Sequence, residues 1–108
     1  MTLLILGLLA IAATAAAQGK QTFTGTITDS MCATANHAPM RMGPTDAECT
    51  TACVEVHDAD YVLYDGKEAY VLSDTRTAAK FAAQKVTVTG TLDAKTRKIQ
   101  VDSIDAAK

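Results

Sequence analysis

Apart from the initiator methionine, all sulfur and imidazole side chains of this sequence lie between positions 31 and 57. They are three cysteines, two histidines and three methionines: Cys32, Cys49, Cys53, His37, His57, Met31, Met40 and Met42. Thiolate, imidazole and thioether groups bind zinc or copper, form disulfides or act as nucleophiles. We therefore expect any chemistry of this protein to take place in this segment.

Two of the cysteines are spaced as neighbours on one helical face. Thr45 and Glu48 form a capping-box pattern, which predicts a helix from about Asp46 to His57. Cys49 and Cys53 would then have Cβ atoms about 5 to 6 Å apart, too far for an undistorted disulfide. They can still bind one ion together, because each thiolate binds zinc at about 2.3 Å.

The loop before this helix can complete a metal site, because it carries a third sulfur and an imidazole. We predict a closed site made by Cys32, His37, Cys49 and Cys53 that holds zinc or copper. Met40 and Met42 follow His37 closely and would suit Cu(I) as further ligands. Alternatively, these two methionines fill gaps at the open end of the fold.

Two other uses of the cysteines stay open. An exported domain meets oxidants, so a disulfide from Cys32 to either helical cysteine would staple the loop to the helix and leave one thiol over. The protein would then be a disulfide-stapled binding module for a protein or glycan partner, with no metal. In a third reading, His57 activates Cys53 as a nucleophile, but the sequence offers no orienting group or oxyanion donor. No phosphate loop, dinucleotide motif or serine elbow is present, so nothing in the sequence requires an enzyme.

The rest of the chain has the patterns of strands. Thr residues alternate with Phe23, Gly25 and Ile27, which predicts a half-buried strand. Asp65 and Gly66 between two apolar runs predict a hairpin with a type I′ turn. Asp74 and Thr75 can cap a short helix. The predicted strands cover residues 22–28, 61–64, 69–72, 86–92 and 99–104.

The fold class that this order predicts is all-β with short helices, a β-rich α+β protein. We expect a five-stranded, OB-like antiparallel barrel. The cysteine-bearing helix lies between strands 1 and 2, and the short helix between strands 3 and 4.

The first 17 residues are apolar and end in small residues, which predicts a signal peptide cleaved after Ala17. An uncleaved anchor or a core helix is the alternative for this stretch. Residues 18–108 would form a single exported domain, periplasmic or secreted, without a stable membrane anchor. The net charge is -2 and the charges are interspersed, which argues against nucleic acid as a partner. We expect a monomer that binds an unidentified protein or small ligand.

A longer pattern runs through the chain: Gly25-x-Ile27-x-Asp29-Ser30-x-Cys32, then His37 and Met40, then Cys49-Thr50-x-x-Cys53, followed by the later strands up to Ile104. With this pattern the sequence resembles a family of uncharacterised small exported bacterial domains. The resemblance implies export, an OB-like fold and a cysteine-rich insertion after the first strand, and it implies no known reaction. Two features depart from the family pattern: the gap from Cys32 to His37 is one residue longer, and His57 stands where a glycine is expected.

Overall fold

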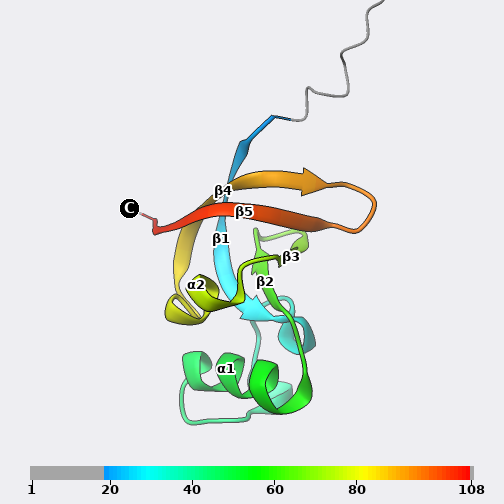
Figure 1. Ribbon diagram of the computed structural model, residues 1–108. Helices are drawn as coiled ribbons and strands as arrows, with labels where there is room; N and C mark the ends of the chain where they lie inside the picture. Colours follow the sequence, from blue (N-terminus) through cyan, green and yellow to red (C-terminus); the bar gives the residue numbers. More distant parts are fainter. Residues whose placement is uncertain (1–18, 108) are drawn as a thin grey trace, which may run out of the picture.

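The computed structural model describes residues 19–107 (Figure 1). The predicted signal peptide lies outside these residues. The elements are β1 (Gln21–Asp29), the 3-10 helices η2 (Ser30–Cys32) and η3 (Ala38–Met40), α1 (Asp46–His57), β2 (Tyr61–Tyr64), β3 (Ala69–Leu72), α2 (Thr75–Lys80), β4 (Lys85–Asp93) and β5 (Lys98–Ala106). Within this part of the chain, no helix is both long and apolar enough to cross a membrane.

The five strands form a closed ring in the order β1-β2-β3-β5-β4. Four neighbouring pairs are antiparallel, whereas β3 and β5 run parallel, with Val71 opposite Lys98 and Leu72 opposite Ile99. The prediction of a wholly antiparallel barrel is therefore wrong at this pair. The reason is geometric, because strands that alternate in direction cannot close a ring with an odd number of members.

The core follows the alternation of the strands. Phe23, Gly25 and Ile27 of β1 point inward as predicted, and Ile27 is fully buried. Apolar side chains from every strand and from α2 form one cluster: Ile27, Tyr61, Leu63, Leu72, Ala78, Val86, Val88, Ile99 and Ile104. This cluster makes the ring a rigid support for the segments at its ends.

The β2–β3 hairpin has the predicted strands and a different turn. Tyr64 pairs with Ala69, so the loop contains four residues, and Gly66 alone among them has a positive φ, of 102°. A type I′ turn needs two residues with positive φ. Here the Asp65 carboxylate instead accepts bonds from the N–H groups of Lys67 and Glu68, both at 2.8 Å. These side-chain hydrogen bonds stabilise a four-residue loop in place of the type I′ turn that we predicted.

Helix α1 begins and ends where the sequence predicted and lies beyond the end of the barrel, below the point where β1 ends (Figure 1). The Thr45 hydroxyl accepts a bond from the N–H of Glu48 at 3.1 Å. In the described residues the reciprocal bond from Thr45 N–H to the Glu48 carboxylate is absent, so only half of the capping box forms. The Glu48 carboxylate is left free and exposed.

Candidate metal centre

Three buried side chains meet where β1 leaves the barrel. Asp29 is the last residue of β1, Cys32 the last of η2, and His37 stands directly before η3. A carboxylate oxygen, the thiol sulfur and a ring nitrogen of these three residues lie within 4.8 Å of one another. Asp29 is 0% exposed, Cys32 6% and His37 3%, so the cluster is shielded from water.

One oxygen of the Asp29 carboxylate accepts hydrogen bonds, and the other accepts none from the described residues. Oδ1 accepts bonds from the N–H groups of Met31 and Cys32, both at 3.0 Å, and so caps η2. This capping fixes the rotation of the side chain. Oδ2 is buried and has no hydrogen-bond partner among the described residues.

The imidazole of His37 is oriented by two threonine hydroxyls. Nε2 lies 3.4 Å from Oγ1 of Thr28 and 3.4 Å from Oγ1 of Thr50. The Thr28 hydroxyl donates its proton to the carbonyl oxygen of Cys32 at 2.8 Å, so toward the ring it can act only as an acceptor. We infer that Nε2 carries the ring proton and that Nδ1 presents a lone pair, since the tautomer follows from the bonding partners.

The two free atoms face each other. Nδ1 of His37 and Oδ2 of Asp29 are 3.9 Å apart, too far for a hydrogen bond, and neither has another partner in the described chain. Two ligand atoms on a tetrahedral zinc ion lie about 3.4 Å apart, given bonds of about 2.1 Å. Two buried acceptors this close without a hydrogen-bond partner are costly, and a cation bound by both would remove that cost. This pair fits a metal ion.

The thiols of α1 border this cluster. Cys49 and Cys53 are both fully buried, and all three cysteines are free thiols. Sγ of Cys49 accepts a bond from the N–H of Met42 at 3.3 Å and donates to the carbonyl oxygen of Met40 at 3.4 Å. The helix and the preceding loop are thereby joined at a sulfur atom.

The thiol pKa values show how near these groups are to one another. Burial raises the pKa of Cys32, with smaller increases from the charge of Asp29 and from Cys49. Burial also raises the pKa of Cys53 to about 11, again with contributions from Asp29, Cys49 and Cys32. Such thiols are protonated and unreactive at neutral pH, which argues against Cys53 as a nucleophile. A bound cation would favour the thiolates instead.

The structure brings together some of the predicted ligands and places others apart. Cys32 and His37 lie in the cluster, whereas Cys49 and Cys53 lie beside it on the buried face of α1. His57, in the last turn of α1, is exposed. Met40 is exposed and Met42 half-buried, and their backbone groups are hydrogen-bonded to the sulfur of Cys49.

Asp29 is a site residue that the sequence analysis did not predict. It directly follows the predicted first strand, residues 22–28, and continues the inward series of Phe23, Gly25 and Ile27 by two residues. In a strand, that period directs its side chain to the buried face. A carboxylate at an inward position three residues before a cysteine was the available signal.

No family model, curated protein or solved structure matches this chain.

Proposed function

We propose that this protein is an exported, OB-like, non-catalytic domain that binds one zinc ion. Asp29, Cys32 and His37 supply three ligands, and a thiol of α1, Cys49 or Cys53, supplies the fourth. The OB-like assignment is supported by the strand order β1-β2-β3-β5-β4 and by the helix between β3 and β4. Export rests on the apolar segment at the start of the sequence.

The observation that carries the metal proposal is the pair of buried atoms Asp29 Oδ2 and His37 Nδ1, which face each other at 3.9 Å without partners. Zinc fits this set better than Cu(I), because a carboxylate oxygen is a hard ligand whereas Cu(I) favours soft sulfur donors. With the α1 thiolate as fourth ligand, the three anionic ligands would more than balance the charge of Zn²⁺, as in structural sites with three cysteines and one histidine. Complete burial is typical of structural zinc sites, which keep no open position for a substrate.

The proposed role of the ion is to hold α1 against the barrel. The fully buried residues of α1 are Cys49, Thr50 and Cys53, and Val54, which packs against the core cluster, is only partly buried. Such a face contributes limited hydrophobic stabilisation. A shared ion would tie β1, η2, the loop at His37 and α1 together.

Elemental analysis of protein purified without chelator tests the proposal, and we expect one zinc ion per chain. His37→Gln should reduce the zinc content to a small fraction, because it removes Nδ1. His57→Gln is the matched control, since this exposed histidine lies outside the cluster, and it should retain full zinc content. Asp29→Asn should weaken zinc binding, because the amide is a poor ligand of nearly the same shape.

Chelator treatment tests the proposed role. We expect backbone amides of residues 46–57 to lose hydrogen-exchange protection when zinc is removed, while amides of β4 and β5 keep theirs. Protein that contains no metal, does not respond to chelator and is two hydrogens lighter by intact mass would contradict the proposal. That result would support the disulfide-stapled binding module instead.

A further inference from the structure

A groove of about 400 Å³ lies between α1 and the segment that runs from α2 to β4. Its apolar lining consists of small side chains from both walls: Ala47, Ala52, Ala79 and Ala82. Figure 1 shows α1 beyond the barrel end and α2 beside the barrel, so the groove lies between two elements with separate supports. Because the apolar part of its lining is made of methyl groups, a peptide backbone can approach it closely.

Charged side chains line the groove in a definite arrangement. Glu48 and Glu55 lie on the α1 wall, seven residues apart. This separation is two helical turns, about 10.5 Å along one face. Lys80 lies on the opposite wall. All three are exposed, and none forms an ion pair with another described residue.

We propose that this groove binds an extended basic peptide segment of a partner protein. In an extended chain of the polyproline II type, which has three residues per turn and rises about 3.1 Å per residue, cationic side chains at positions i and i+3 lie on one face about 9 Å apart. This spacing is close to the separation of Glu48 and Glu55 along α1. Small residues between them let the chain lie close to the alanine lining. Lys80 repels a further cation, so the segment carries a neutral or acidic residue at that side.

The charges select the class of partner. Two carboxylates on one wall repel phosphate groups, so nucleic acid and anionic membrane surfaces are poor occupants. A basic segment is attracted by both carboxylates at once. Because these pairs are exposed, we expect modest affinity that falls as salt is added.

The groove and the metal centre share α1. Glu48 directly precedes Cys49, and Glu55 follows Cys53 by two residues. The same helix therefore has the two glutamates of the groove on its exposed side and the two thiols on its buried side. The coupling that follows rests on the proposed function: zinc positions α1 and thereby forms the groove. Removal of zinc should weaken peptide binding without any change to the groove residues.

Fluorescence anisotropy with a labelled hexapeptide tests the proposal. The probe contains two arginines separated by alanine and valine, and the control probe has glutamates in place of the arginines. We expect saturable binding of the basic probe alone. Glu55→Lys should weaken it about tenfold, because it replaces an attraction with a repulsion, and Lys80→Glu should strengthen it.

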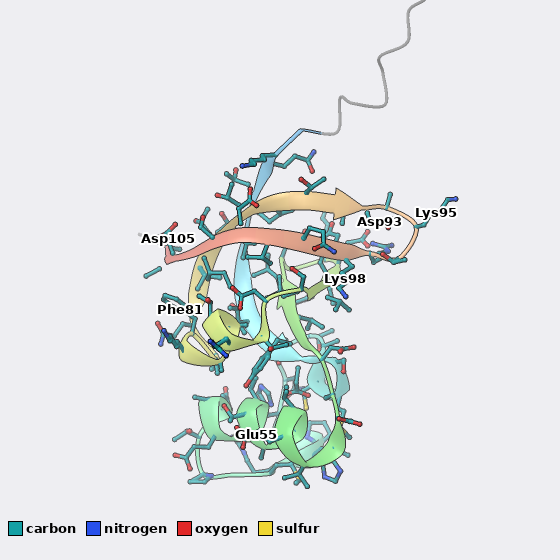
Figure 2. The ribbon with its side chains drawn as sticks, in the orientation of Figure 1. Glu55, Phe81, Asp93, Lys95, Lys98 and Asp105 are labelled. Atoms are coloured by element: carbon teal, nitrogen blue, oxygen red, sulfur yellow. The ribbon has the colours of Figure 1, made fainter. Side chains whose placement is uncertain are left out.

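Asp105→Lys is the matched control for Glu55→Lys. Asp105 is an exposed carboxylate on β5, and Figure 2 shows it near the end of this strand, away from Glu55 on α1. This variant makes the same change of charge and should leave binding unchanged. Circular dichroism of each variant checks that α1 still forms.

The outcomes separate the two proposals. The groove proposal is wrong if the basic probe does not bind at millimolar concentration. It is also wrong if Glu55→Lys and its control Asp105→Lys weaken binding of the probe equally. If the protein self-associates and Glu55→Lys abolishes this self-association, the occupant of the groove is a second copy of the chain, and the proposal of a basic partner segment is overturned. If the probe binds in a Glu55-dependent way to protein that never contains metal, the groove proposal stands and the zinc proposal fails.

Discussion

At the scale of single residues, two hydroxyl groups determine what the buried histidine can do. The hydroxyl oxygens of Thr28 and Thr50 both lie 3.4 Å from Nε2 of His37, and the Thr28 hydroxyl donates its proton to the carbonyl oxygen of Cys32. The ring therefore directs Nδ1 toward Asp29. Groups that orient a metal-ligating histidine in this way tune affinity although they do not touch the ion.

Thr28→Val tests this positioning role, because valine has nearly the same shape and lacks the hydroxyl. We expect zinc affinity to fall about tenfold, the lower end of the range for loss of a group that orients a ligand. Competition with a chromogenic chelator measures the change. Thr22→Val on the exposed part of β1 is the control and should bind zinc like the native protein. Equal affinities for both variants would contradict the role of Thr28.

The residues of the centre were predictable to the extent that their chemistry is visible in the sequence. Thiols and imidazoles stand out, so Cys32 and His37 were identified without a structure. Asp29 was missed because aspartate also ends strands and caps helices, and it does cap η2. Its second role arises from burial, which depends on how β1 is covered, and strand alternation was the only hint.

At the scale of elements, the two α-helices attach to the barrel by different means. α2 buries Ala78 fully and packs it into the apolar core, and Asp74 caps its first turn. α1 fully buries two thiols and a hydroxyl, and packs only the partly buried Val54 against the apolar core. Both helices were predicted from their caps and periodicity. The prediction of a type I′ turn was wrong because the Asp65 side chain accepts hydrogen bonds from the backbone N–H groups of the loop and so favours a different turn geometry.

The cap of α2 gives a pH-dependent prediction. Hydrogen bonds from Thr77 lower the pKa of Asp74 from its ordinary value of 3.8. The stabilisation from the charged cap is therefore complete above pH 3.8 and is lost as the pH falls through the lower pKa of the folded state. At pH 7, Asp74→Ala should reduce the free energy of unfolding by about 1 kcal/mol.

Urea unfolding at several pH values measures this effect. Asp74→Asn keeps the acceptor and removes the charge, so its difference from the native protein should disappear in the most acidic buffers. Asp105→Asn on exposed β5 is the control and should show no comparable difference at pH 7. An Asp74→Asn difference that persists at the lowest pH would show that the charge is not the cause.

At the scale of the whole molecule, closure of the ring depends on β1, which belongs to two pairings. Residues 21–26 of β1 pair with β4, and residues 26–29 pair with β2. The strand passes from one neighbour to the other at Gly25 and Thr26, close to the backbone of Tyr64. A Cβ atom at Gly25 would lie 2.3 Å from the Tyr64 carbonyl oxygen. The predicted alternation placed Gly25 inward, but this close approach becomes visible only when the ring is closed.

Gly25→Ala should therefore weaken the barrel itself. We expect a loss of about 2 kcal/mol in the free energy of unfolding, typical of forcing an extra methyl group into a packed site. Thr24→Ala, at the exposed neighbouring position, is the control and should cost much less. Asp29 follows Gly25 by four positions, about 13 Å along a strand, so the effects of this substitution and of zinc removal should add. If chelator abolished the difference between Gly25→Ala and the native protein, barrel closure and the metal centre would be one cooperative unit rather than two independent ones.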